Sequence, residues 1–168
     1  MKKWSLLALG LFVACSLLAQ DLVVPRLTQE QKEDVLYQHV MAYAITGISF
    51  AKSEGNTPEE YGRFIGKSFS SLWDPSAGYD MFAGQLMYIL AGLHPDNQME
   101  IVEQDGKMIR FRMKNVDLFF QNGPVFDVTY QEFLDCSYGI ISELAGYMGV
   151  DFSHRMEGEW YEVTFREK

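Results

Sequence analysis

Cysteine is almost absent from this 168-residue sequence, which contains only Cys15 and Cys136. Cys15 lies inside an apolar N-terminal stretch, so a chain that loses this stretch keeps Cys136 alone. A single cysteine forms no intramolecular disulfide, and it excludes a zinc site built from several thiolates. The folded domain must therefore be stabilised by packing alone.

Positive charge is also scarce. The sequence has 14 lysine and arginine residues against 23 aspartate and glutamate residues, which gives a net charge of −9. A surface of that sign repels phosphate backbones and anionic lipid headgroups. We therefore expect neither nucleic acid nor an anionic membrane surface as a partner.

The motifs of several common enzyme classes are missing. The sequence contains no glycine-rich phosphate loop, no G-x-S-x-G and no H-E-x-x-H. Its three histidines, His39, His94 and His154, share no spacing that would preform a metal site. We therefore expect no metal and no cofactor, and the missing motifs argue against the common hydrolases, kinases and nucleotide-binding proteins.

Residues 1–19 are organised like a secretory signal peptide. Lys2 and Lys3 come first, the 15 residues from Trp4 to Leu18 are mostly apolar, and a small alanine at position 19 suits a signal peptidase. The apolar run is shorter than the roughly 20 residues needed to span a bilayer. We expect no membrane span, and export to the periplasm or cell envelope of a bacterium.

Cys15 offers an alternative route, lipoprotein processing, which would leave a lipid anchor on that residue. We favour cleavage after Ala19, because the chain stays apolar beyond Cys15 instead of opening into a polar tether. Residues 20–168 are then a single domain with 12 basic and 23 acidic residues, a net charge of −11. A chain of this length can bury a substantial core.

Three capping patterns predict where helices begin. Thr28 precedes Gln31 by three residues, and Thr129 precedes Glu132 in the same way, so that each pair can satisfy two free backbone N–H groups. In the third pattern, Pro58 occupies the first helical position. With the spacing of the apolar residues, these patterns predict helices over residues 28–53, 57–72, 79–93 and 129–149.

Asp-Gly at 105–106 and Glu-Gly at 157–158 are predicted to be the turns of two β-hairpins. Ile109, Phe111 and Met113 alternate with polar residues, which predicts a sheet with one buried side. The strands are expected over residues 99–104, 107–113, 150–156 and 160–166. The predicted fold class is α+β, with helices packed on one face of an antiparallel sheet in the order three helices, hairpin, helix, hairpin.

His39 and Tyr43 are four residues apart on the first predicted helix and are candidate ligand-binding residues. One interpretation makes His39 a ligand-facing side chain, such as an axial ligand to a haem or metal. We favour the other interpretation, a core histidine bonded to a backbone group or a tyrosine.

Cys136 and His154 are the other candidate ligand-binding residues. They are also weak candidates for catalysis, with Cys136 as the nucleophile and His154 as the base. Cys136 shares a helical face with Phe133 and Ile140, which is typical of a small buried hydrophobe. His154 alternates with apolar residues such as Phe152, so it is the histidine that we expect to be buried. A catalytic pair would require a hydrogen bond between the two side chains.

Flexible apolar residues are abundant, with nine methionines, 12 phenylalanines and nine tyrosines in the chain. Methionine adapts to irregular spaces and to apolar ligands. Without a catalytic motif, this composition favours a noncatalytic domain that binds a small apolar ligand or a protein partner. Two alternatives remain: a hydrolase-like enzyme that uses Cys136 and His154, and a structural envelope protein.

The C-terminal part also resembles one fold superfamily through residues 133–136 (FLDC), Gly149 and residues 158–165 (GEWYEVTF). This superfamily includes 4-vinyl reductase domains, haem nitric-oxide-binding domains, TRAPP vesicle-tethering subunits and the similar aminothiazoline-carboxylate hydrolase-like proteins. The resemblance implies that a small molecule or acyl chain binds between helices and sheet. The metal-using branches carry a cysteine in the last strand, where this chain has Tyr161 and Val163, so the resemblance implies no catalytic residue here.

Overall fold

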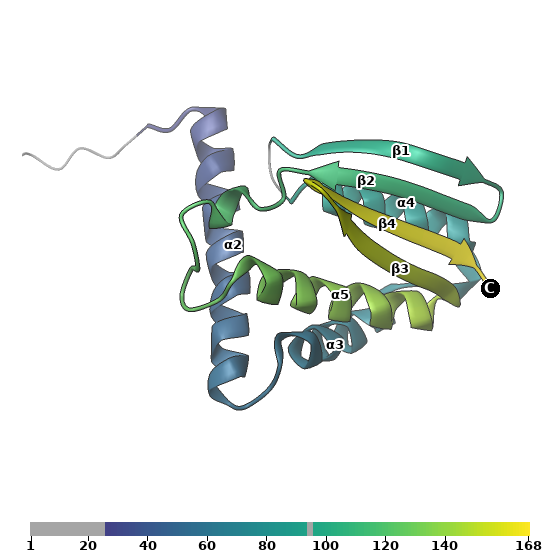
Figure 1. Cartoon of the computed structure of the whole chain (residues 1–168), viewed down its shortest axis with the longest axis horizontal. Helices are drawn as coiled ribbons and strands as arrows, with labels where there is room; N and C mark the ends of the chain where they lie inside the picture. Colours follow the sequence, from purple (N-terminus) through teal and green to yellow (C-terminus); the bar gives the residue numbers. More distant parts are fainter. Residues whose placement is uncertain (1–25, 94–95) are drawn as a thin grey trace, which may run out of the picture. The chain divides into compact units, whose positions relative to one another are not determined.

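A computed structural model describes residues 26–93 and 96–168, and Figure 1 shows them as a ribbon. The predicted leader, with Cys15, and His94 lie outside the described residues. Residues 36–168 form one compact unit, and the chain up to Val35 belongs to another. The unit that ends at Val35 includes the start of the first helix, where the Thr28 hydroxyl accepts a hydrogen bond from the Gln31 N–H at 3.2 Å.

The described residues contain four α-helices and a four-stranded antiparallel sheet, which confirms the predicted α+β class. The helices are α2 (Gln29–Ser53), α3 (Pro58–Phe69), α4 (Gly78–Ala91) and α5 (Tyr130–Tyr147). Thr57 and Thr129 cap α3 and α5, each in a reciprocal pair of bonds with the glutamate three residues later. Within the described part of the chain, no helix is both long and apolar enough to cross a membrane.

The strands of the sheet are β1 (Gln98–Asp105), β2 (Met108–Lys114), β3 (Val150–Glu157) and β4 (Trp160–Glu167). Their order across the sheet is β1-β2-β4-β3, so the two hairpins are joined through β2 and β4. On β2, Ile109, Phe111 and Met113 are buried, whereas Arg110 and Arg112 between them are only partly covered. This confirms the alternation predicted from the sequence.

The buried side of the sheet packs against α4 and α5. Phe165 of β4 is fully buried, and its ring centroid lies 5.5 Å from that of Phe82 in α4 and 6.0 Å from that of Phe111 in β2. From α5, Ile141 and Leu144 join the same cluster. Figure 1 shows α4 passing behind the strands. Each large side chain buried in this way contributes about 2 kcal/mol to stability, so the cluster fixes α5 against the sheet.

The helices α3 and α5 approach each other so closely that only glycine fits at their contact. A Cβ atom at Gly62 would lie 2.0 Å from the carbonyl oxygen of Cys136, and one at Gly139 would lie 2.3 Å from that of Glu59. At Gly66 the nearest backbone oxygen would be 2.7 Å away. This close backbone contact holds α5 against α3, and it was not predicted from the sequence.

A second cluster holds α2 against α5. From α2 it takes Met41, Ile45 and Ile48, which recur at helical spacing, and from α5 it takes Phe133 and Cys136. Because α5 contributes to both clusters and also packs on α3, it is the central element of the unit. Side chains on α5 are therefore held in well-defined positions.

Candidate functional site

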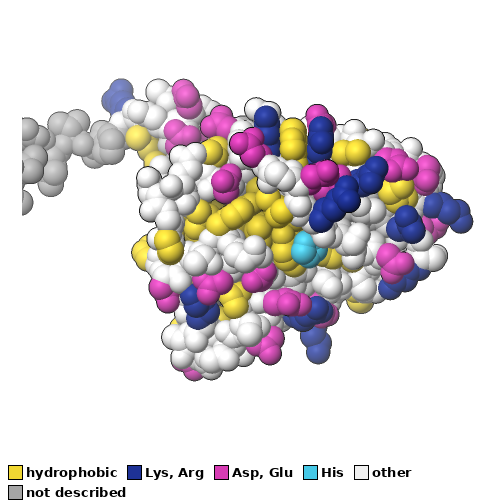
Figure 2. Space-filling view, in the orientation of Figure 1, with side chains coloured by type: hydrophobic (Ala, Val, Ile, Leu, Met, Phe, Trp, Pro, Cys, Tyr) yellow, Lys and Arg dark blue, Asp and Glu magenta, His cyan; other side chains and the backbone are white. Residues whose placement is uncertain are grey.

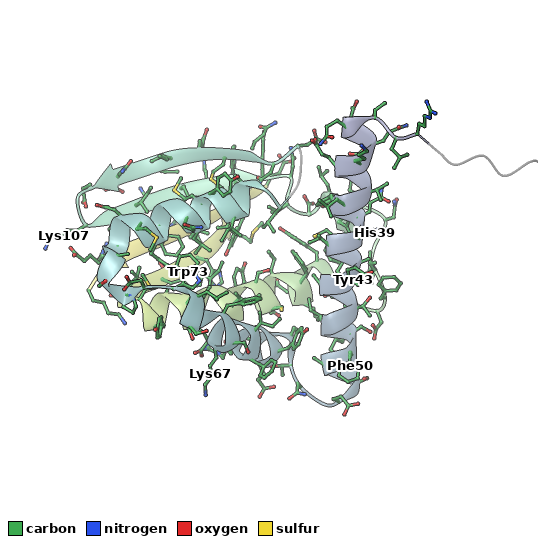
Figure 3. All side chains as sticks on the ribbon, turned by 180° about the vertical axis from the view of Figure 1, so that it is seen from behind. His39, Tyr43, Phe50, Lys67, Trp73 and Lys107 are labelled. Atoms are coloured by element: carbon green, nitrogen blue, oxygen red, sulfur yellow. The ribbon has the colours of Figure 1, made fainter. Side chains whose placement is uncertain are left out.

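His39 and Tyr43 lie together on α2, with ring centroids 6.4 Å apart. Both side chains are exposed, Tyr43 to 78% of its surface, and Figure 3 shows them on α2 with Phe50 further along the helix. The favoured expectation of a core position for His39 is therefore wrong. The buried face of α2 is formed by residues such as Met41 and Ile45, and His39 and Tyr43 point away from it.

Cys136 is only 4% exposed and lies in the cluster that joins α2 to α5. Burial raises the pKa of its thiol to about 11. The group is therefore a neutral thiol at physiological pH, and a neutral thiol is a poor nucleophile. This environment agrees with a small hydrophobe and gives no support to the nucleophile that the hydrolase alternative requires.

His154 lies on β3, an edge strand of the sheet, and its side chain is exposed. The expectation that it is buried is wrong, because the edge position leaves the ring open to solvent. One face of the imidazole is nevertheless covered by the ring of Tyr138 from α5, at a centroid distance of 3.4 Å. Partial loss of hydration lowers the pKa of His154, against the opposing effect of Asp135 and Glu59. The imidazole is therefore mainly neutral at pH 7.

The structure does not bring Cys136 and His154 together as a catalytic pair. Within residues 26–93 and 96–168 no hydrogen bond joins them, and neither group contributes to the pKa of the other. The four predicted site residues therefore occupy three places: the exposed side of α2, the buried cluster and the edge of the sheet. Of these, only the edge of the sheet has the features of a binding site.

Three tyrosines surround the place where His154 meets α5, and we name these four residues the tyrosine–histidine cluster. Tyr161 of β4 is 2% exposed, and its ring centroid lies 5.5 Å from that of Tyr138 and 6.1 Å from that of His154. The third tyrosine, Tyr130, lies at the first position of α5 and is partly buried.

The Tyr161 hydroxyl is the unusual group of the cluster. It is buried, and it makes no hydrogen bond of ordinary geometry with any residue that the structure describes, although the Tyr138 hydroxyl lies near enough to interact with it. Burial raises the pKa of Tyr161 far above its usual value, and the neighbouring Tyr138 phenol raises it further. Burial also raises the pKa values of Tyr130 and Tyr138. All three phenols are therefore protonated at physiological pH and are available as hydrogen-bond donors.

A hollow of about 390 Å³ lies beside the cluster. Tyr130 lines it together with Met156, which is the register partner of Tyr161 across the hairpin. Val116 and Leu118 add apolar surface, whereas Lys114, Asp117 and Glu159 add charged groups. The volume lies within the roughly 300–1,000 Å³ that is typical of small-molecule sites. Figure 2 shows a continuous band of hydrophobic side chains on this face, directly above α5.

A wider hollow of about 620 Å³ lies between α3 and α5, lined by residues that include Arg63, Phe64 and Tyr147. Arg63 is already paired there with Glu143 at 3.2 Å. None of the buried polar atoms without a partner in the described residues belongs to its lining. The smaller hollow differs from the wider one because Tyr130 of the tyrosine–histidine cluster lines it, next to the register partner of Tyr161.

Of the four residues in the cluster, only His154 was predicted from the sequence as a site residue, whereas Tyr130, Tyr138 and Tyr161 were not. A signal was present, because Tyr161 alternates with Val163 on β4, and Tyr138 is three residues from Ile141 on α5. Both tyrosines are thus predicted to face the boundary between helix and sheet. No pattern in the sequence indicates that a hydroxyl there would lack a partner.

The described part of the chain contains no group of three histidine, cysteine, aspartate or glutamate side chains that could hold a metal ion. Comparison with known proteins found no matching family model, no matching curated protein and no matching solved structure. The geometry of the site is therefore the basis on which a function is proposed below.

Proposed function

We propose that this chain is an exported, noncatalytic domain that binds a small, largely apolar ligand beside the tyrosine–histidine cluster. The observation that carries the proposal is the buried Tyr161 hydroxyl without a hydrogen-bond partner. The proposal includes the arrangement expected from the sequence, in which three helices, a hairpin, a helix and a hairpin follow one another and the helices cover one face of the sheet. The ligand would then lie between α5 and the β3–β4 hairpin.

Burying a hydroxyl without a partner costs about 1–3 kcal/mol. A ligand that places a carbonyl or another acceptor near Tyr161 would remove much of this cost. The surrounding rings of Tyr138 and His154 favour an aromatic or flat aliphatic body, since such groups pack well against rings. The ligand class is therefore a compact apolar molecule with at least one hydrogen-bond acceptor.

A noncatalytic role is supported by the surroundings of Cys136 and His154. Catalysis by acyl transfer requires a nucleophile with a base in hydrogen-bonding distance. Cys136 is buried in a different cluster, with its pKa raised to about 11 by burial. Because its pKa is lowered, His154 is a weak base, and the Tyr138 phenol stacked on it keeps its proton. The hydrolase alternative is therefore the less favoured proposal.

Export and its route remain part of the proposal. Residues 1–19 and Cys15 lie outside the described residues, so the supporting observations are those of the sequence. Mass spectrometry of the protein from its own host would decide between cleavage after Ala19 and a lipid on Cys15. A mature N-terminus at Gln20 supports free diffusion in the periplasm or envelope, and a diacylglyceryl group on Cys15 supports an anchor.

The ligand proposal can be tested with prodan, an aromatic ketone whose fluorescence shifts to shorter wavelength in an apolar site. We expect saturable binding by the wild-type protein and about fivefold weaker binding by Tyr161→Phe, because one hydrogen bond is worth about 1 kcal/mol. Tyr79→Phe is the matched control, since the Tyr79 hydroxyl is also buried without a partner but lies on α4. Equal affinities of the wild type and Tyr161→Phe would contradict the proposal.

A protein partner is the second candidate, and the exposed side of α2 favours it. Leu36, Val40, Tyr43 and Phe50 are 64%, 56%, 78% and 65% exposed. Their spacing of four, three and seven residues is that of a seam between two helices, and the seam carries no charge. We propose a second copy of this chain as its occupant. The same apolar stripe would also suit a structural envelope protein.

Sedimentation equilibrium tests this second candidate. The wild type should self-associate, and Tyr43→Glu should abolish the association by placing a charge in the seam. Tyr88→Glu is the control, because Tyr88 is 81% exposed on α4 and lies outside the seam. A wild-type protein that stays monomeric at all concentrations would exclude the second copy as the occupant.

A further inference from the structure

The side of the sheet opposite the core carries an ordered array of charged side chains. Arg112 of β2 lies in register between Glu100 of β1 and Glu162 of β4, and Glu162 is in register with Arg155 of β3. Figure 2 shows basic and acidic side chains beside one another over the strands. The charges thus alternate across all four strands, an arrangement that stabilises neighbouring strands.

The adjacent row breaks this alternation. It contains Arg110 of β2, Thr164 of β4 and Ser153 of β3 in register. A hollow of about 170 Å³ is lined by these three residues together with Arg155 and Glu162 of the charged row, and by His154. Neither the Thr164 nor the Ser153 hydroxyl makes a hydrogen bond with another side chain in the part of the chain that is described. The hollow is therefore surrounded by donors with free capacity.

Arg110 is the most important of these donors. One end of its guanidinium is paired, with Nη2 lying 2.8 Å from Oε2 of Glu103. Its Nε is buried and has no acceptor among the described residues. A charged N–H that is removed from water and left without an acceptor is costly, so an acceptor placed beside it is strongly favoured.

Arg155 provides the second cation. Its Nε lies 2.8 Å from Oε1 of Glu162, and its Nη2 lies 3.3 Å from Oε2 of Glu157. These pairs hold the guanidinium in place through Nε and Nη2, and neither pair uses its Nη1 group. Glu162 is only 5% exposed, so its carboxylate serves to fix Arg155.

We propose that this hollow binds an oxyanion group, either a carboxylate or a phosphate, between Arg110 and Arg155. Its lining carries two arginines and one glutamate, and Glu103 and Glu157 pair with these arginines from outside the lining, so free N–H groups and not net charge would attract the anion. An acceptor-rich group would bond with Arg110 Nε and with the hydroxyls of Thr164 and Ser153. The site is small, so it fits a single anionic group and excludes a nucleic-acid backbone. The side chains of Arg110, Thr164 and Ser153 lie on the side of the sheet opposite the tyrosine–histidine cluster, and His154 is the residue that the two sites share.

The two sources of such a group can be distinguished by titrating the protein with acetate and with inorganic phosphate at low ionic strength. Nuclear magnetic resonance of the arginine Nε–H groups reports the binding. We expect a saturable shift of the Arg110 signal with at least one of the two anions. A response to acetate alone assigns a carboxylate ligand, and a response to phosphate alone assigns a phosphate.

Two variants make the test specific. Arg110→Lys keeps the charge but removes the Nε–H fork and should weaken binding about tenfold. Thr164→Val keeps the shape of the side chain and should weaken binding about threefold if its hydroxyl takes part. Arg166→Lys is the control, because Arg166 lies on β4 outside the lining and should leave binding unchanged. The absence of a saturable shift, or equal losses in Arg166→Lys and Arg110→Lys, would overturn the proposal.

Discussion

The imidazole of His154 lies face to face with the phenol ring of Tyr138, with their centroids 3.4 Å apart and their planes 17° from parallel. This stack joins the edge strand β3 to the central helix α5. It also places a titratable ring beside the buried Tyr161. A neutral imidazole loses less hydration in such a contact than a charged one, so the stack depends on pH.

Stability should therefore fall as the pH drops through the titration range of His154. Loss of hydration lowers its pKa in the folded protein below the usual 6.5, so the unfolded chain binds this proton at a higher pH than the folded chain. The contribution of His154 is fully present above about pH 6.5 and is lost as the pH falls from there towards the folded pKa. Urea unfolding at several values between about pH 8 and pH 5 would measure this loss.

His154→Phe is the matching variant, because it keeps a ring over Tyr138 and removes the titration. It should flatten the pH dependence in this window. The carboxylates with lowered pKa values, Glu60, Asp74 and Glu132, titrate below their usual values of 4.5 and 3.8 and act only at lower pH. An unchanged slope in His154→Phe would show that another group is responsible.

Tyr161→Phe should stabilise the ligand-free protein, although it weakens ligand binding. The substitution removes a buried hydroxyl that has no partner and leaves the ring in place, so the free energy of unfolding should rise by about 1 kcal/mol. Thermal or urea unfolding would measure the gain. A residue whose removal increases stability and decreases binding is the expected signature of a functional group. A loss of stability would show that the hydroxyl is bonded in solution and that the ligand proposal lacks its main support.

The sequence was sufficient for the features that depend on neighbouring residues. The starts of α3 and α5 were predictable because Thr57 and Thr129 bond with groups only three residues away. The buried side of β2 was predictable because alternation along one strand requires no knowledge of the rest of the fold. Local patterns thus defined the α+β class and most element boundaries.

The candidate site depends instead on distances between elements. Helical and strand periods indicated the side on which His39 and His154 lie, but they did not show whether another element covers that side. Both histidines are exposed, against expectation. The unpaired state of the Tyr161 hydroxyl depends on how far α5 lies from β4, and no local pattern encodes that distance.

Gly62→Ala should strongly destabilise the protein. The new methyl group would lie 2.0 Å from the Cys136 carbonyl oxygen, and neither backbone can move without breaking the contact between α3 and α5. A clash with backbone atoms of this kind costs about 3 kcal/mol or more. Gly84→Ala in α4 is the control, because nothing lies within 4 Å of its new Cβ, and it should gain about 0.5–1 kcal/mol from helix propensity. Similar unfolding midpoints for the two variants would contradict the close helix contact.

Cys136 should react with thiol reagents only when the protein unfolds. Burial raises its pKa to about 11, so at pH 8 only about one thiol in a thousand is ionised, and the side chain is also 4% exposed. Labelling by iodoacetamide, followed by mass spectrometry across a urea series, should therefore follow the unfolding curve. A catalytic thiol would behave in the opposite way, with fast labelling of the folded protein, because activation by a neighbouring base lowers the pKa. Fast labelling of folded wild-type protein would restore the hydrolase alternative, and a rate that His154→Phe reduces would identify His154 as the base.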